Sequence, residues 1–122
     1  IAFHWLLWKV RPLKFNEWTG KPCDMLSIIQ QSGGTIMFDA YHVGVEGDDV
    51  VETLKHYWPI IGHVQIAAVP SRQEPDEGTF DYRELFSALD ELGYSGWIGC
   101  EYKPRSSVED GLVWTEKLGV SL

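Results

Sequence analysis

The sequence has few cysteines, few basic residues and no long hydrophobic run. Its two cysteines, Cys23 and Cys100, are far apart and show no CxxC or Cys/His spacing, so neither a zinc site nor a disulfide framework is indicated. This cysteine usage favours a reducing, cytoplasmic setting. The apolar opening, residues 1–10, contains His4 and Lys9 and is too short for a membrane span. We therefore expect no membrane partner.

Basic residues are scarce relative to acidic ones. The chain has 10 Lys and Arg against 18 Asp and Glu, which gives a formal net charge of −8. Nucleic-acid affinity comes largely from Lys and Arg that neutralise phosphates, so this balance argues against a nucleic-acid partner. The composition of the 122 residues, 44% hydrophobic and 23% charged, is typical of a single globular domain over 1–122. An initiator Met is missing, which indicates a piece of a longer reading frame or a trimmed chain.

From Thr35 onward, short β-rich runs alternate with amphipathic stretches, the pattern of βα units around a parallel sheet. Strands are predicted at residues 35–39, 63–68 and 96–101. The two prolines and four charged residues of 69–78 predict a long polar loop after the second strand. Residues 1–33 are atypical, since prolines and glycines interrupt them and only 24–31 indicates a short helix.

Helices are predicted where a capping residue precedes apolar residues at helical spacing. Asp48 or Asp49 begins the first, Asp81 begins the second, and Ser107 begins the last. Gly93 stands where a glycine commonly ends a helix. One stripe of the second helix should face the sheet, made of Leu85, Phe86, Leu89 and Leu92, with Arg83, Glu84, Asp90 and Glu91 facing solvent.

Three oxygen-bearing side chains lie near the ends of the three predicted strands. Asp39 ends the first strand, Gln65 lies within the second, and Glu101 ends the third. Because catalytic groups gather at the carboxyl ends of parallel strands, these side chains should converge. Oxygen ligands of this kind suit a hard divalent cation, Mg²⁺ or Mn²⁺.

Each of these residues also has a simpler interpretation. An Asp at a strand end is more often a helix cap or turn former, and Gln65 alone would more often satisfy a neighbouring backbone group. Glu101 follows an apolar run, where a carboxylate is costly unless it is paired or coordinated. A salt bridge from Glu101 to Lys103 or Arg105 is the structural alternative to a metal ligand.

Four further residues lie near the strand ends. His42 and His63 each flank one, where a lone histidine is more often a hydrogen-bonded packing residue than a ligand or base. Arg72 lies in the loop after the second strand and could grip a substrate carboxylate with two donors, although loop arginines are usually solvated. Cys100 is expected as a small buried side chain, not a nucleophile, because no base accompanies it.

Several segments of the chain resemble the hydroxypyruvate isomerase family in order and spacing. The run Gly99-Cys100-Glu101-Tyr102-Lys103-Pro104 is the most specific, and the related 2-oxo-tetronate isomerases share most of the pattern. Sugar epimerases of similar fold usually have a His at the position of Gln65, so Gln65 argues against an epimerase. The resemblance covers roughly residues 34–114, and the family-like βα units extend over 34–118. The matching segments are 37–42, 61–67, 72–75, 89–94 and 96–104.

The resemblance implies an α/β fold, part of a xylose isomerase-like (β/α)₈ TIM barrel comprising about its last three βα units. It implies that Asp39, Gln65 and Glu101 are metal ligands, that Glu101 is also an acid/base, and that His42 and Arg72 lie near the substrate. The implied reaction is a metal-assisted aldose–ketose isomerisation of a small sugar acid, hydroxypyruvate to 2-hydroxy-3-oxopropanoate, through an enediolate.

The chain departs from the family pattern before residue 34. The family's second catalytic glutamate ends the fifth strand in a Glu-Pro-Ile-Asn-like motif, and neither the neighbours nor the spacing of Glu17 matches it. We therefore expect impaired activity. One alternative is a 2-oxo-tetronate isomerase. Another is a non-catalytic barrel fragment, whose open strand edges would favour a homo-oligomer.

Overall fold

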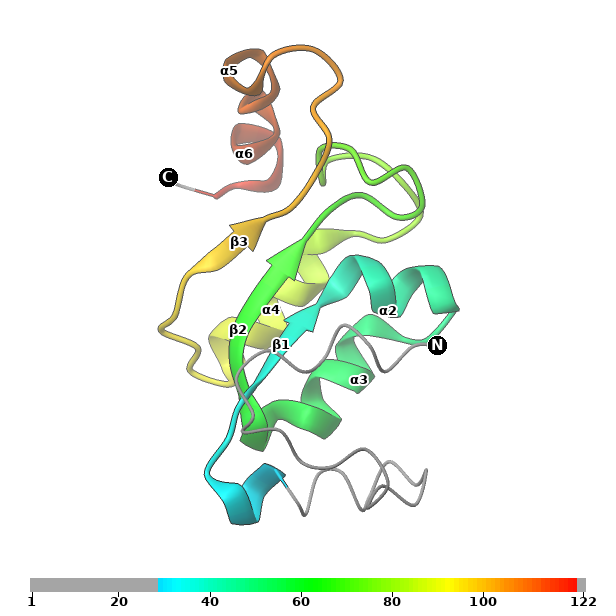
Figure 1. Ribbon diagram of the computed structural model, residues 1–122. Helices are drawn as coiled ribbons and strands as arrows, with labels where there is room; N and C mark the ends of the chain where they lie inside the picture. Colours follow the sequence, from blue (N-terminus) through cyan, green and yellow to red (C-terminus); the bar gives the residue numbers. More distant parts are fainter. Residues whose placement is uncertain (1–28, 121–122) are drawn as a thin grey trace.

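The computed structural model describes residues 29–120, a three-stranded parallel sheet with helices along it (Figure 1). Residues 29–32 are helical, and the rest of the predicted helix at 24–31 lies outside the described residues. No helix in the described part is long and apolar enough to cross a membrane. In chain order the elements are β1 (Ile36–Asp39), α2 (Ala40–Glu46), α3 (Val50–Tyr57), the 3₁₀ turn η3 (Trp58–Ile60), β2 (Ile61–Ile66), α4 (Tyr82–Glu91), β3 (Ile98–Cys100), α5 (Val108–Gly111) and α6 (Val113–Leu118).

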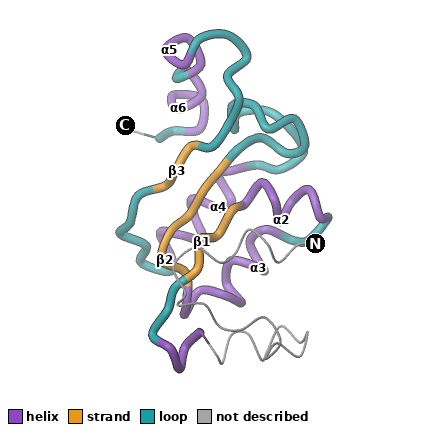
Figure 2. Tube along the Cα trace, in the orientation of Figure 1, coloured by secondary structure: helices purple, strands orange, loops and turns teal. Residues whose placement is uncertain are grey.

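The spatial order of the strands is β1-β2-β3, the same as their order in the chain, and both pairings are parallel. The β2 strand is central and contacts both of the others (Figure 2). All three strands run in the same direction, so their carboxyl ends lie at one edge of the sheet. The predicted partial barrel of βα units is confirmed.

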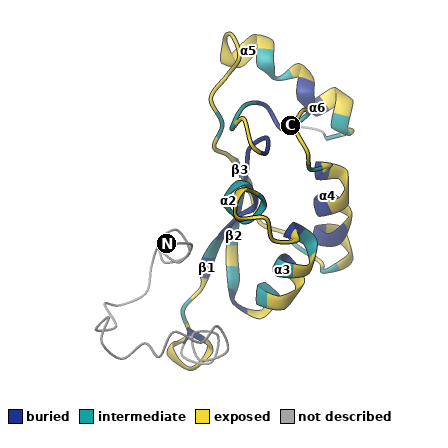
Figure 3. Ribbon diagram, turned by 90° about the vertical axis from the view of Figure 1, so that its right-hand side faces the viewer, coloured by how far each residue is buried: buried dark blue, intermediate teal, exposed yellow. Residues whose placement is uncertain are grey.

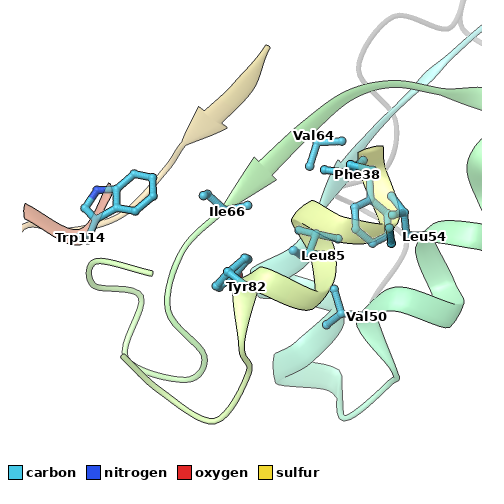
Figure 4. Packing of buried hydrophobic residues seen from close by; sticks show 11 residues of the cluster. Phe38, Val50, Leu54, Val64, Ile66, Tyr82, Leu85 and Trp114 are labelled. Atoms are coloured by element: carbon cyan, nitrogen blue, oxygen red, sulfur yellow. The ribbon is translucent and has the colours of Figure 1, made fainter. Parts of the chain in front are cut away.

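One face of the sheet packs on α3 and α4 (Figure 3). Alternate strand residues point to that face, so Phe38, Val64 and Ile66 are buried there against Leu54 and Leu85 (Figure 4). The predicted stripe of α4 is confirmed. Leu85 and Leu89 are buried, Phe86 and Leu92 are partly buried, and the four polar side chains expected on the opposite side are exposed.

The predicted helix starts are also confirmed, because each cap makes a specific hydrogen bond, although the single helix predicted after Ser107 is divided into α5 and α6. The carboxylate of Asp49 accepts from the Glu52 amide at 2.9 Å, and that of Asp81 accepts from the Arg83 amide at 3.0 Å. The hydroxyl of Ser107 accepts from the Asp110 amide at 3.1 Å. Gly93 has φ +74°, the left-handed conformation that a glycine adopts after a helix.

Besides shifts of about two residues in the strand ends, two features near the strands differ from the sequence prediction. The first is α2, which follows β1 without a loop. Asp39 ends the strand and caps the helix at once, so no turn residue marks the boundary. The second is Cys100, which is exposed and not buried as predicted. The reason is that β3 is an edge strand, with β2 as its only partner among the described strands.

The loop at 69–78 is less solvated than its polar composition predicts. Glu74 is fully buried, and its Oε2 accepts from Nε of Arg105 at 2.8 Å. Arg105 also pairs with Asp76 at 2.7 Å and with Glu77. Lys117 of α6 reaches the second oxygen of Asp76 at 2.5 Å. These ion pairs join the loop to the C-terminal helices, which extend beyond the carboxyl end of β3 in Figure 1.

The two buried carboxylates of this loop remain acidic. Burial alone would raise the pKa of Glu74, but hydrogen bonds and the charge of Arg105 outweigh it and hold the pKa below the ordinary value of 4.5. Burial likewise opposes ionisation of Asp76, whose pKa is nevertheless lowered by Lys117 and Arg105. Both carboxylates therefore stabilise the fold as anions.

We predict that Leu54→Ala, at a fully buried position of α3, lowers the free energy of unfolding by about 2–5 kcal/mol because it leaves a cavity under the sheet. The matched control is Val45→Ala on the exposed side of α2, which should change it by about 0.5 kcal/mol or less. Urea denaturation measures both. Equal effects of the two substitutions would contradict this assignment of the core.

A second prediction concerns pH. The pKa of Glu74 is lower in the folded than in the unfolded chain, so its stabilisation is complete above the ordinary pKa and is lost as pH falls through the folded value. The melting temperature of Glu74→Gln should therefore lie furthest below that of the unmodified chain near neutral pH. Below about pH 4 the two should approach each other. A constant difference in thermal melts across this range would refute the ionised pair.

Candidate functional site

The structure brings Asp39, Gln65 and Glu101 to the same end of the sheet. Asp39 and Gln65 are partners in the β1–β2 register, and Gln65 lies opposite Gly99 of β3. The Glu101 amide extends the β2–β3 pairing by donating to the Ile66 carbonyl at 3.1 Å. Side chains alternate along a strand, so Asp39 and Gln65 point away from the helix-covered face. The three side chains thus come from successive strands, as the sequence predicts.

Asp39 combines both roles that its position suggested. Its Oδ1 accepts from the Tyr41 amide at 3.0 Å and caps α2, while Oδ2 lies 3.7 Å from Nε2 of His42. The residue is only 7% exposed, and this burial raises the pKa of its carboxyl. His42 and two backbone amides partly offset the rise, whereas the negative charge of Glu101 adds to it. Oδ1 thus caps α2, while Oδ2 faces the His42 ring, and the carboxylate feels the negative charge of Glu101.

Gln65 carries the clearest sign of a ligand-binding role. Its amide oxygen Oε1 is buried and accepts no hydrogen bond from the described residues. Leaving a buried acceptor unpaired costs about 1–3 kcal/mol, so such an atom calls for an explanation. The expected alternative, a bond to a neighbouring backbone group, is not made by this oxygen.

Gly99 gives the Gln65 side chain its space. A Cβ at Gly99 would lie 3.2 Å from Cγ of Gln65 and 3.0 Å from Nε2 of His63. Both of these β2 side chains therefore cross the neighbouring strand where it has no side chain of its own. From its strand-end position His63 was expected to be a packing residue, and Gly99 had no predicted role at the site. Their signal was register, since His63 precedes Gln65 by two residues and Gly99 lies opposite it.

Glu101 is paired, but not with the residues proposed from sequence spacing. Its Oε1 accepts from Nη2 of Arg72 at 2.6 Å, whereas Arg105 pairs with Glu74. Arg72 is not simply solvated, because its side chain is 28% exposed and its guanidinium lies 5.1 Å from the centre of the Tyr41 ring. Sequence reasoning missed Tyr41, and the position two residues after Asp39 was its only signal.

The donor set fits a hard divalent cation. Asp39 and Glu101 supply carboxylate oxygens and Gln65 supplies an amide oxygen, the ligand types that Mg²⁺ and Mn²⁺ prefer. Within residues 29–120, no three His, Cys, Asp or Glu side chains are gathered as a metal site, so the set depends on Gln65. Arg72 pairs with one carboxylate oxygen of Glu101 and would compete with a metal ion for it. Half-exposed ion pairs of this kind stabilise a protein by only about 0–1 kcal/mol. Glu17 lies outside the described residues.

One family model matches the chain. It describes a xylose isomerase-like TIM barrel and covers residues 14–118. The match takes in part of segment 1–33, which the sequence analysis described as atypical.

Individual proteins are also similar to this chain in sequence or in structure. The 2-oxo-tetronate isomerase of Pectobacterium atrosepticum is 39% identical over 108 residues, 88% of this chain and 41% of the relative. The hydroxypyruvate isomerase of Escherichia coli is 40% identical over 81 residues, 66% of this chain and 31% of the relative. A crystal structure described as AP endonuclease, family 2, from Brucella melitensis is 34% identical with a TM-score of 0.70, over 87% of this chain and 44% of that one.

This chain thus spans less than half the length of each of these proteins. Its parallel βα units agree with the barrel architecture, and its curated relatives include isomerases. The chain belongs to the xylose isomerase-like TIM barrel family.

Proposed function

We propose that residues 29–120 form the metal- and substrate-binding end of an isomerase that interconverts hydroxypyruvate and 2-hydroxy-3-oxopropanoate. The reaction moves a proton between adjacent carbons and passes through an enediolate. The observation that carries the proposal is the buried Oε1 of Gln65, unpaired among the described residues, on the strand between those that lead to Asp39 and Glu101. The names of the curated relatives support an isomerase, and the choice of substrate follows from the sequence resemblance.

In this proposal Asp39, Gln65 and Glu101 hold Mg²⁺ or Mn²⁺. When bound, the cation would polarise two substrate oxygens and stabilise the negative charge that develops on them. Asp39 contributes the oxygen that does not cap α2, and Gln65 contributes the oxygen that has no other partner. The cation would also offset the like charges of the two carboxylates.

The protein's own residues then position the substrate and move its proton. Glu101 is the acid/base, because its carboxylate is exposed enough to reach a substrate and is directed by Arg72. Arg72 commits Nη2 to Glu101, which leaves its other guanidinium N–H groups for a substrate carboxylate. His42 lies beside Asp39 on the substrate side. Proton return needs a second acid/base glutamate besides Glu101, and none of the described residues was identified as that glutamate.

A 2-oxo-tetronate isomerase is the second candidate, favoured by the 88% of this chain that matches the Pectobacterium protein. The proton transfer would be the same, and a four-carbon acid would replace the three-carbon one.

We further propose a cytoplasmic protein that associates with copies of itself and binds neither membranes nor nucleic acid. The net charge of −8 disfavours nucleic acid, although the Brucella relative is described as an endonuclease. A non-catalytic fragment is the remaining alternative.

A metal titration tests the site directly. Gln65→Leu should weaken Mn²⁺ binding, followed by electron paramagnetic resonance, by at least about tenfold because it removes a ligand. The same change should leave the melting temperature unchanged or raise it, since it removes a buried unpaired acceptor. Glu109→Gln, at an exposed position of α5, is the matched control and should bind Mn²⁺ normally. Unaltered Mn²⁺ affinity in Gln65→Leu would rule out the proposed ligand set.

The activity prediction follows from the lack of an identified second acid/base glutamate among the described residues. Removing one positioned acid/base typically costs about 10²–10⁴-fold in rate, so the 122-residue chain should be a very poor isomerase. Hydroxypyruvate and a four-carbon 2-oxo acid are each assayed with excess Mg²⁺ or Mn²⁺, with Glu101→Gln as the control. Turnover at about 1–10³ s⁻¹ that Glu101→Gln abolishes would show that another residue, Glu17 first among them, supplies the carboxylate.

A further inference from the structure

We propose that the buried ion pair between Glu74 and Arg105 is a positioning device that holds Arg72 and Glu101 against each other. The inference rests on the proposed function, because Arg72 and Glu101 matter only if this end of the sheet is the site. Neither Glu74 nor Arg105 contacts the candidate ligands. Both act through the backbone segments that carry Arg72 and Glu101.

Glu74 is built into the structure more firmly than an ordinary loop carboxylate. Its side chain is fully buried, and its two oxygens receive the Arg105 backbone amide at 3.1 and 3.3 Å and Nε of Arg105 at 2.8 Å. Gly111 leaves room for it, because a Cβ there would lie 2.5 Å from Oε1 of Glu74. The carboxylate thus fixes the backbone of Arg105 as well as its side chain.

The Glu74–Arg105 pair is one of three connections between residues 72–74 and residues 101–105. Arg72 stands two residues before Glu74, and Glu101 stands four residues before Arg105. The Arg72–Glu101 pair joins the segments at 2.6 Å, the Lys103 amide donates to the Arg72 carbonyl at 2.8 Å, and the Glu74–Arg105 pair closes the series. The Glu74 side of the Glu74–Arg105 pair is buried, whereas the Arg72–Glu101 pair is half-exposed. The buried pair therefore fixes how the two segments align, and this alignment places Arg72 next to Glu101.

The loop conformation shows why such support is needed. Arg72 has φ +57°, a left-handed conformation that a residue with a side chain adopts only when its surroundings impose it. Its amide donates to the Ala68 carbonyl at 2.8 Å, and the Ala68 amide donates to Gln73 at 2.9 Å, directly before Glu74. Glu74 therefore anchors the end of the tight turn that presents Arg72.

A purely structural role in attaching α5 and α6 explains less. Lys117 already joins α6 to Asp76, and Trp114 is buried in the main core. Arg105 has Asp76 and Glu77 as further partners, so its charge is balanced without Glu74. The feature that Glu74 alone provides is the bond to the Arg105 amide, which fixes the path of the chain after Glu101.

The test compares Glu74→Gln with Glu77→Gln in the full chain. Both changes remove one negative partner of Arg105, but only the first turns a buried acceptor into a donor facing the Arg105 N–H groups. We measure hydrogen exchange of the Lys103 amide and the ¹⁵N guanidinium signal of Arg72, assigned with Arg72→Lys. Attachment of α5 and α6 alone would not alter either signal. Exchange of the amide of Leu89, a buried residue within α4, reports overall stability.

Glu74→Gln should speed Lys103 exchange at least about tenfold relative to Leu89 and remove the signature of a paired guanidinium at Arg72. Glu77→Gln should leave both signals unchanged. If Glu74→Gln does not fold, Glu74→Asp keeps the negative charge but draws the carboxylate back from the Arg105 amide, and should shift the same two signals. Intact Lys103 and Arg72 signals in the folded variants would overturn the inference.

Mn²⁺ titration of the same samples separates the inference from the proposed function. If both hold, Glu74→Gln weakens Mn²⁺ binding and Glu77→Gln does not. If the unmodified chain binds no Mn²⁺ but the Lys103 and Arg72 signals change as expected, the positioning role stands and the proposed metal site fails. Unchanged signals with normal Mn²⁺ binding overturn the positioning role and leave the proposed site intact.

Discussion

The parallel pairing of β2 with both of its neighbours is the constraint on which the rest of the structure depends. It aligns Asp39 with Gln65, and Gln65 with Gly99, so that groups from distant parts of the chain share one end of the sheet. Because side chains alternate along a strand, the same register sends Phe38, Val64 and Ile66 to the helices. A shift of one residue would exchange the core and the site.

The two faces of the sheet therefore meet different requirements. The helix-covered face is close-packed and apolar, and its burial supplies the main driving force for folding. The opposite face carries groups that would be unfavourable in such a core. They include the unpaired oxygen of Gln65 and the carboxyl of Asp39, whose pKa is raised by burial. Unsatisfied polar atoms and neighbouring carboxylates oppose stability, and in folded proteins they are often found where a ligand binds.

The loop after β2 shows how such a site gains support from a distance. Its buried Glu74 and Asp76 are ionised because Arg105 and Lys117 lie beside them, and these cations come from the C-terminal part of the chain. The loop, the segment after β3 and the last helices are thus joined by charge as well as by packing. This arrangement keeps Arg72 near Glu101 although the two are 29 positions apart.

The sequence by itself determined the βα order, the helix caps and the apolar stripe of α4, because these depend on local periodicity and short-range hydrogen bonds. It also indicated Asp39, Gln65 and Glu101, because strand ends can be located before strands are paired. Only the tertiary structure decided the partner of Glu101, the burial of Glu74 and the exposure of Cys100. Those features depend on which distant segments lie side by side, and spacing along the chain carries no information about that.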